Sequence, residues 1–111
     1  MHDLVTLNGQ WWDWQVDRWD VSEFRLIADN DLTYHHSVAV TFTDVAWVSC
    51  ADLFHHPVFR SPRIPETEFM RQVATEDEHH VYAWDAETAT GIVPMMVVAR
   101  SARIVEQVVH H

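Results

Sequence analysis

Apolar and polar side chains alternate with a period of two along much of this chain. The longest alternating segment covers residues 32–43, where almost every second position is apolar or aromatic. Neighbouring side chains on a strand point to opposite faces of a sheet, so the pattern predicts a half-buried strand with Val40 facing the core and Thr41 facing solvent. His36 shares the phase of Val40, so we expect it at the edge of the core, with His35 in solvent.

Two shorter segments near the N-terminus show the same alternation. One apolar set consists of Trp12, Trp14 and Val16, and the other consists of Phe24, Leu26 and Ala28. The Asp-Asn-Asp sequence at 29–31 is typical of a turn. Segments 23–28 and 32–43 should therefore pair as an antiparallel hairpin. The period also predicts that Trp12 lies in the core and that Trp11 lies on the opposite face.

The alternation breaks at Asp44, which predicts a turn or a bulge. The stretch ADLFHHPVFRSPRIP (51–65) shows no regular period, so we expect an irregular connection. Pro65 suits the first position of a helix, and Phe69 and Met70 begin a short apolar stripe behind it. One short helix is therefore predicted after the irregular stretch.

Two further strands complete the prediction. Residues 81–84 read as a strand, residues 85–91 as a polar connection, and residues 92–105 as one long or bent strand with Pro94 at its start or on an edge. The sequence thus predicts a mainly β (α+β) fold in a single domain over residues 1–111. We expect an antiparallel curled sheet or half-barrel of five to seven strands with one short helix, because a flat open sheet leaves exposed edges.

The charge of the chain restricts its chemistry. There are 17 acidic residues against seven basic residues, all of them arginine, which gives a formal net charge of −10. The absence of lysine from the sequence excludes a Schiff-base lysine and a P-loop lysine. A strongly acidic chain repels phosphate backbones, so we expect no nucleic-acid partner. The same charge favours a basic protein partner, or serves solubility alone.

The remaining composition predicts a cytoplasmic protein. No apolar run is long enough to span a membrane, and the first residues, MHDLVTLNG, do not read as a secretory signal. The single cysteine, Cys50, excludes an intramolecular disulfide and fits a reducing compartment.

Eight of the nine histidines occur as four adjacent pairs, at 35–36, 55–56, 79–80 and 110–111. Two neighbours on a strand point to opposite faces, so one pair cannot chelate one metal ion. Glu76 with His79 or His80 has the spacing of one helical turn, but a lone motif of this kind is a weak signal. We therefore expect no metal site and no cofactor, and we expect the terminal pair, His110 and His111, to be frayed or to be the remnant of a purification tag.

Cys50, Asp52 and His55 offer a thiol, an orienting acid and a base within six residues. A cysteine nucleophile is defined by convergence in three dimensions and not by such a spacing, and a lone cysteine at a strand end is usually a buried apolar residue. We therefore predict no catalytic residue and no enzymatic activity.

The tryptophans near the N-terminus offer a binding surface. Four of them fall within nine residues and are interleaved with acids. Tryptophan is enriched at interfaces, and an exposed indole beside acids can also stack a sugar. Our candidate ligand- or partner-binding residues are Trp11, Asp13, Asp17, Trp19 and His35. We also expect a homodimer, since an open sheet has an edge to protect and since Trp11 and Trp19 leave more aromatic surface than one small core needs.

The segments YHHSVAVTFTDVAWVSC (34–50), HPVFR (56–60) and VVARSARIV (97–105) resemble a pattern in small acidic all-β bacterial proteins of the type that confers immunity beside polymorphic toxins. The resemblance implies a non-enzymatic partner binder and carries no active-site residue. Our first hypothesis is a small acidic interaction protein that binds a basic protein partner. The alternative is a small-molecule or carbohydrate-binding β-module that uses the tryptophan cluster.

Overall fold

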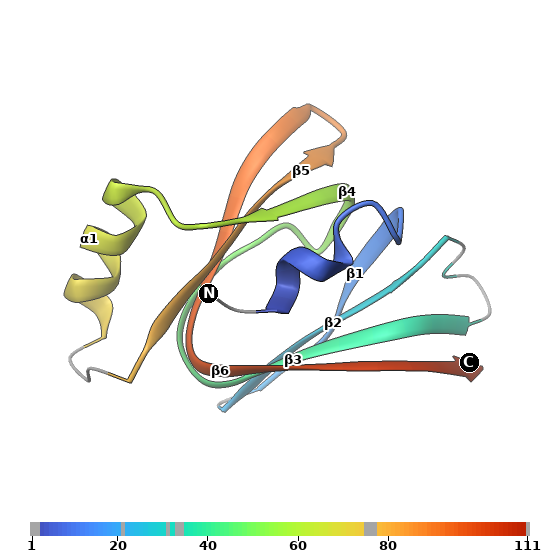
Figure 1. Ribbon diagram of the computed structural model, residues 1–111, viewed down its shortest axis with the longest axis horizontal. Coiled ribbons are helices and arrows are strands. Elements are labelled where there is room, and N and C mark those ends of the chain that lie inside the picture. Colours follow the sequence, from blue (N-terminus) through green and yellow to red (C-terminus); the bar gives the residue numbers. More distant parts are fainter. Residues whose placement is uncertain (1–2, 21, 31, 33–34, 75–77, 111) are drawn as a thin grey trace.

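Six antiparallel strands close into a barrel in the computed structural model of the protein (Figure 1), which describes residues 3–20, 22–30, 32, 35–74 and 78–110. The elements in chain order are the 3-10 helix η1 (Asp3–Leu7), β1 (Asp13–Trp19), β2 (Glu23–Asp29), β3 (His35–Ser49), β4 (Leu53–Arg60), α1 (Ile64–Val73), β5 (His80–Thr88) and β6 (Gly91–His110). Around the barrel the order is β1-β2-β3-β6-β5-β4, and β4 pairs with β1. The predicted mainly β fold with one short helix is confirmed, and the curled sheet closes fully.

The hairpin of β2 and β3 has the predicted register, with Leu26 paired to Val40. Val40 and its apolar companions on β3 face inward and are fully buried. Large aromatic side chains from five strands fill the barrel, namely Trp14, Phe24, Phe42, Phe54, Phe59 and Trp84. The interior is therefore a packed core.

The opposite face of β3 differs from the prediction. Thr41 is only 2% exposed, so the expectation that it lies in solvent is wrong. The Nε of Arg25 donates a hydrogen bond to Thr41 Oγ1 at 3.2 Å. On the other side of Thr41, the paired residue on β6 is Arg103. His36 lines a small pocket of about 180 Å³ together with these three residues, so it does not share the core-facing phase of Val40.

Strand β4 occupies the stretch that we expected to be irregular. Its alternation is hidden because His56 has a left-handed backbone, with φ of +49°, and the pairing with β5 shifts between His55 and Val58. Phe54 is buried before this bulge, and Phe59 is buried after it. An extra residue in a strand breaks the period of two, which explains why the sequence pattern missed this strand.

The phase break at Asp44 is confirmed as an irregularity within β3. Asp44 has φ of +51°, and the register against β6 shifts between Val45 and Trp47. The strand nevertheless continues to Ser49, so β3 and β6 form the longest pairing in the barrel.

Strand β6 is long and bends, as predicted (Figure 1). Its first part pairs with β5, and its later part pairs with β3. Pro94 pairs only with Asp85 of β5 in the described register, so it lies on a local edge of the sheet where no donor is needed. The connection that we placed at 85–91 is shorter than expected, because β5 extends to Thr88.

The two helices cover different parts of the barrel. Leu4 and Leu7 of η1 are buried in the main core. The side-chain amide of Asn8, just after η1, makes the two hydrogen bonds to β4 that a neighbouring strand would otherwise make at Phe59. Its Nδ2 donates to the carbonyl oxygen of Phe59 at 2.9 Å, and its Oδ1 accepts from the Phe59 N–H at 2.7 Å.

Helix α1 packs on the outer side of the sheet, at one end of the molecule in Figure 1. Met70 and Val73 rest against a second apolar cluster made of Val81, Ala83 and Val98. The predicted apolar stripe of the helix is therefore its packing face.

Candidate functional site

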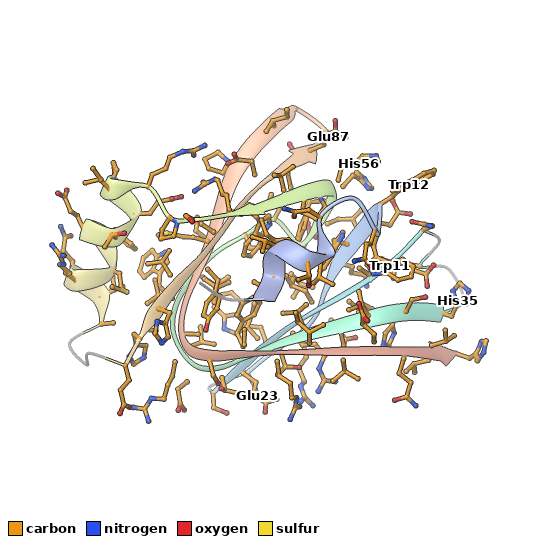
Figure 2. All side chains as sticks on the ribbon, in the orientation of Figure 1. Trp11, Trp12, Glu23, His35, His56 and Glu87 are labelled. Carbon is orange, nitrogen blue, oxygen red and sulfur yellow. The ribbon has the colours of Figure 1, made fainter. Side chains whose placement is uncertain are left out.

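The start of β1 and the bulge of β4 meet at one end of the barrel (Figure 2). The backbone N–H of His56 donates to the carbonyl oxygen of Trp12 at 3.0 Å, and the two rings lie 5.9 Å apart between centroids. His55 Nδ1 lies 2.9 Å from Asp13 Oδ1, and His56 Nε2 lies 3.9 Å from Glu87 Oε2. We call these five residues the rim site.

The left-handed residue in β4 creates this arrangement. On a regular strand, His55 and His56 would point to opposite faces. At the bulge both imidazoles are about half exposed, while the next residue, Pro57, is buried. One imidazole reaches Asp13 on β1, and the other reaches Glu87 on β5. The bulge thus lets two adjacent histidines contact the two strands that flank β4.

The rim site combines an aromatic surface with negative charge. Trp12 is 56% exposed and its ring lies next to that of His56, whose imidazole is close to the carboxylate of Glu87. The carboxylate of Asp13, the next residue, lies beside the imidazole of His55. A cation over the face of an indole is attracted by the ring quadrupole, and neighbouring carboxylates add to that attraction. With neutral imidazoles, the site has the chemistry to hold an arginine or lysine side chain.

The two tryptophans at the start of this region have exchanged the positions that we predicted. Trp12 is exposed and Trp11 is half-buried against the core, so the prediction of Trp12 in the core is wrong. The reason is that β1 begins only at Asp13, so the period of two does not apply before it. The carbonyl oxygen of Trp11 accepts a hydrogen bond from Trp14 Nε1 at 3.1 Å.

The five candidate residues from the sequence do not form one site. Asp13 belongs to the rim site, and Trp11 is its half-buried neighbour. Asp17 lies further along β1, 3.8 Å from Arg25 NH1, and Trp19 ends the strand, 62% exposed and edge-on to Phe24. Asp13 and Trp19 are the first and last of the seven residues of β1, which places them roughly 20 Å apart.

His35, the fifth candidate, lies at the start of β3. Its Nδ1 is 3.5 Å from Asp29 Oδ2, and its ring lies 5.9 Å from that of His110 between centroids. Figure 2 places it further along the same side of the molecule as Trp11. His110 is the last residue of β6 and pairs with His35, so the expectation that it is frayed is wrong.

Sequence reasoning missed four of the five rim-site residues, namely Trp12, His55, His56 and Glu87. The available signal was the His-His-Pro sequence inside an otherwise apolar stretch, which marks the strand bulge. Glu87 comes close only through the pairing of β5 with β4, which no local pattern predicts.

The histidine pairs do not gather into a recognisable metal centre within the part of the chain that the structure describes. No group of three or more His, Cys, Asp or Glu side chains there has the arrangement to hold a metal ion. Tyr34, Glu76 and His111, which entered our reading of the sequence, lie outside the described residues. That the protein needs no metal stays a prediction.

Cys50 has the surroundings of a buried thiol. Its Sγ donates to the carbonyl oxygen of Ala51 at 3.1 Å. Burial raises the pKa of the Cys50 thiol to about 12, and the charge of Asp52 acts in the same direction. His55 makes its contact with Asp13, on another strand. The thiol therefore remains protonated at neutral pH and is a poor nucleophile.

Comparison of the chain with protein-family models, with curated proteins and with solved structures finds no match. Among the described residues, no helix is both long and apolar enough to cross a membrane.

Proposed function

We propose that this protein is a non-enzymatic interaction protein that binds a basic protein partner at the rim site. The observation that carries the proposal is the exposed ring of Trp12 between residues that bring two carboxylates, Asp13 and Glu87. An arginine or lysine of the partner would lie over the indole and reach these carboxylates. The net charge of −10 would speed the encounter with a basic surface.

The packed interior supports a surface function. Core side chains fill the interior of the barrel, so a partner cannot bind inside it. The exposed rim is where a partner can bind. The resemblance to immunity-type proteins agrees with partner binding. The single half-buried cysteine fits a reducing compartment, and we place the function in the cytoplasm.

The proposal is tested with a short capped peptide of two arginines spaced by glycines, titrated into the protein and followed by NMR. Trp12→Ala should weaken binding at least about tenfold, the equivalent of 1.4 kcal/mol. Trp47→Ala is the control, because Trp47 is also an exposed tryptophan and lies on β3, outside the rim site. Equal effects of the two substitutions would show that the rim site is not the binding surface.

A carbohydrate-binding module remains the second candidate, because the exposed ring of Trp12 could also stack a sugar. A neutral trisaccharide such as cellotriose in the same titration separates the two. Saccharide binding that is lost in Trp12→Ala, with no binding of the arginine peptide, would establish the second candidate in place of the first.

We also propose a homodimer, on one of the two grounds that the sequence offered. Closure of the barrel removes the open edge that motivated this expectation. The exposed indole of Trp19, which packs edge-on against Phe24, remains as an apolar surface for a second copy. Light scattering should report a dimer that Trp19→Ala weakens; a monomer at high concentration would exclude it.

A further inference from the structure

Strands β2, β3 and β6 lie side by side (Figure 1), and the pocket of about 180 Å³ runs along their outer face. One row across the three strands consists of Arg25, Thr41 and Arg103, which are paired in that order. The rest of the lining comes from residues nearer the start of β3 and the end of β6, namely His36, Ala39, Val105, Gln107 and Val109. The pocket therefore has two guanidinium groups at one end.

The surroundings of these two arginines hold little negative charge. None of the described residues that line the pocket is acidic, although the chain has 17 acidic residues. The carboxylate of Asp17, on β1, lies 3.8 Å from Nη1 of Arg25, which is long for an ion pair. Glu23, in the next row of the sheet, bonds to Arg18 at 2.8 Å. The positive charge of the row is thus only partly balanced.

Arg103 is the more open of the two arginines. It is exposed, and its guanidinium group makes no hydrogen bond or ion pair with any residue that the structure describes. Four other arginines contact carboxylates at 3.3 Å or less, namely Arg18, Arg60, Arg63 and Arg100. In so acidic a protein, a guanidinium group without a carboxylate is free to bind an anion from solution.

Thr41 orients the second guanidinium group. Its side chain is buried, and its Oγ1 accepts the hydrogen bond from Nε of Arg25. This bond leaves Nη2 of Arg25 without a partner among the described residues. Arg25 and Arg103 are two strands apart, which is roughly 10 Å between Cα atoms, so both long side chains can reach one carboxylate above Thr41.

The other part of the pocket is apolar. Val105 is 41% exposed and Val109 is 42% exposed, and Ala39 is the residue of β3 that pairs with Val105. The small side chain of Ala39 leaves room for an apolar chain that would cover the two valines. The volume is below the ~300–1,000 Å³ of sites for drug-sized ligands, so only a short chain fits.

We propose that this pocket binds a short aliphatic carboxylate, with its carboxylate group between Arg25 and Arg103 and its chain along Ala39 and Val105. The single charge of a carboxylate meets less repulsion from the net charge of −10 than a phosphate dianion does. The pocket shares no residue with the rim site, so each can fail without the other.

The probe is hexanoate, titrated at pH 7.5 and constant ionic strength into the ¹⁵N-labelled protein. The amide resonances of Ala39 and Val105 should shift along a saturable curve at millimolar concentrations. Arg103→Gln removes the charge but keeps most of the aliphatic stem, and should weaken binding at least about tenfold. Arg71→Gln is the matched control, because it changes the net charge equally but lies on α1, outside the pocket. It should leave the affinity unchanged.

The apolar part is tested with other ligands and a blocking variant. Acetate, which lacks the chain, and 1-hexanol, which lacks the charge, should each bind at least about tenfold more weakly than hexanoate. Ala39→Leu fills the pocket and should abolish saturation, whereas Thr43→Leu, further along β3 and outside the pocket, should not. Unchanged melting temperatures verify that the variants are folded.

Three outcomes would overturn the proposal. They are the lack of a saturable shift in the wild-type protein, equal affinity of the wild type and Arg103→Gln for hexanoate, and tighter binding of inorganic phosphate than of hexanoate.

Discussion

The imidazole of His55 lies 2.9 Å from the carboxylate of Asp13, and this contact spans the seam at which β4 closes the barrel on β1. The seam is short: three residue pairs join the two strands. Both side chains are more than a third exposed, so the contact adds little to stability. The rim site therefore lies on the narrowest join of the barrel without being essential to it.

Asp13→Asn should separate binding from stability at this seam. The free energy of unfolding should change by less than about 1 kcal/mol, because exposed pairs contribute no more than that. Affinity for the arginine peptide should fall, because one of the two carboxylates loses its charge. Urea denaturation and the peptide titration measure the two quantities. A large loss of stability with unchanged affinity would make Asp13 a structural residue only.

Val40→Asp and Thr41→Asp test the two faces of β3. Val40 is fully buried in the core, so a carboxylate there would be unpaired, and we expect a loss of more than about 4 kcal/mol of unfolding free energy. Thr41 is also buried, but Arg25 touches it and Arg103 is paired with it, so a carboxylate would find partners. Thr41→Asp should therefore lose only about 1–2 kcal/mol of unfolding free energy. Equal losses in urea melts would refute this reading of the sheet.

The sequence predicted the parts of this fold that are regular. The β2–β3 hairpin followed from alternation, because every second residue from Phe24 to Ala28 and from Val38 to Phe42 enters one core. Strand β4 did not, because a single left-handed residue, His56, reverses the phase between Phe54 and Phe59. The rim site depends on that reversal and on pairing with β5, so it could not be found before the strands were placed. Trp12 was missed for a simpler reason: it precedes β1.

A network of ion pairs holds the start of α1 against the barrel. Arg60 makes two bonds to Glu66, at 2.7 and 2.9 Å, and a third to Asp85 at 3.2 Å. The hydrogen bond from Arg60 lowers the pKa of Glu66 below its ordinary value of 4.5. Burial raises the pKa of Asp85, but the bonds from Arg60 and Arg63 more than offset it, so this pKa also lies below its ordinary value, 3.8.

Stability should therefore fall as the pH drops below about 4.5. A carboxyl group whose pKa is lower in the folded state stabilises the fold above its unfolded pKa, and this contribution is lost as the pH falls through the folded pKa. Glu66→Gln should cost about 1–3 kcal/mol at pH 7 and should flatten the decline between pH 5 and about pH 3. Urea midpoints across this range measure it, with the exposed Glu68→Gln as control. An unchanged slope in Glu66→Gln would assign the decline to other carboxylates.

Cys50 should react slowly with thiol reagents in the folded protein. Burial, together with the charge of Asp52, raises the pKa of its thiol to about 12, so almost none of the reactive thiolate is present at pH 8. Ellman's reagent should label Cys50 at least about a hundredfold faster after unfolding in guanidinium chloride. Rapid labelling of the native protein at pH 8 would mean that the thiol is accessible and activated, and would reopen a catalytic role.

Partner binding should weaken as the pH falls from 7.5 to 5.5. Histidine is the side chain whose unperturbed charge changes in this range, and protonation of all nine would bring the formal net charge from −10 to −1. At the rim site, positive imidazoles at His55 and His56 would neutralise the carboxylates of Asp13 and Glu87 and repel an arginine placed over Trp12. The association rate and the affinity of the arginine peptide should therefore both fall at fixed salt.

Two double variants separate the contribution of the rim-site histidines to this pH dependence from the contribution of the overall net charge. A double variant with His55→Gln and His56→Gln keeps neutral side chains there at both pH values, so its pH dependence should be smaller than that of the wild type. A variant with His35→Gln and His110→Gln removes the same number of histidines from another pair of strands and should keep the wild-type dependence. If both double variants flatten the profile equally, the histidines act only through the net charge, and the pairing of His55 and His56 at the bulge has no special part in binding.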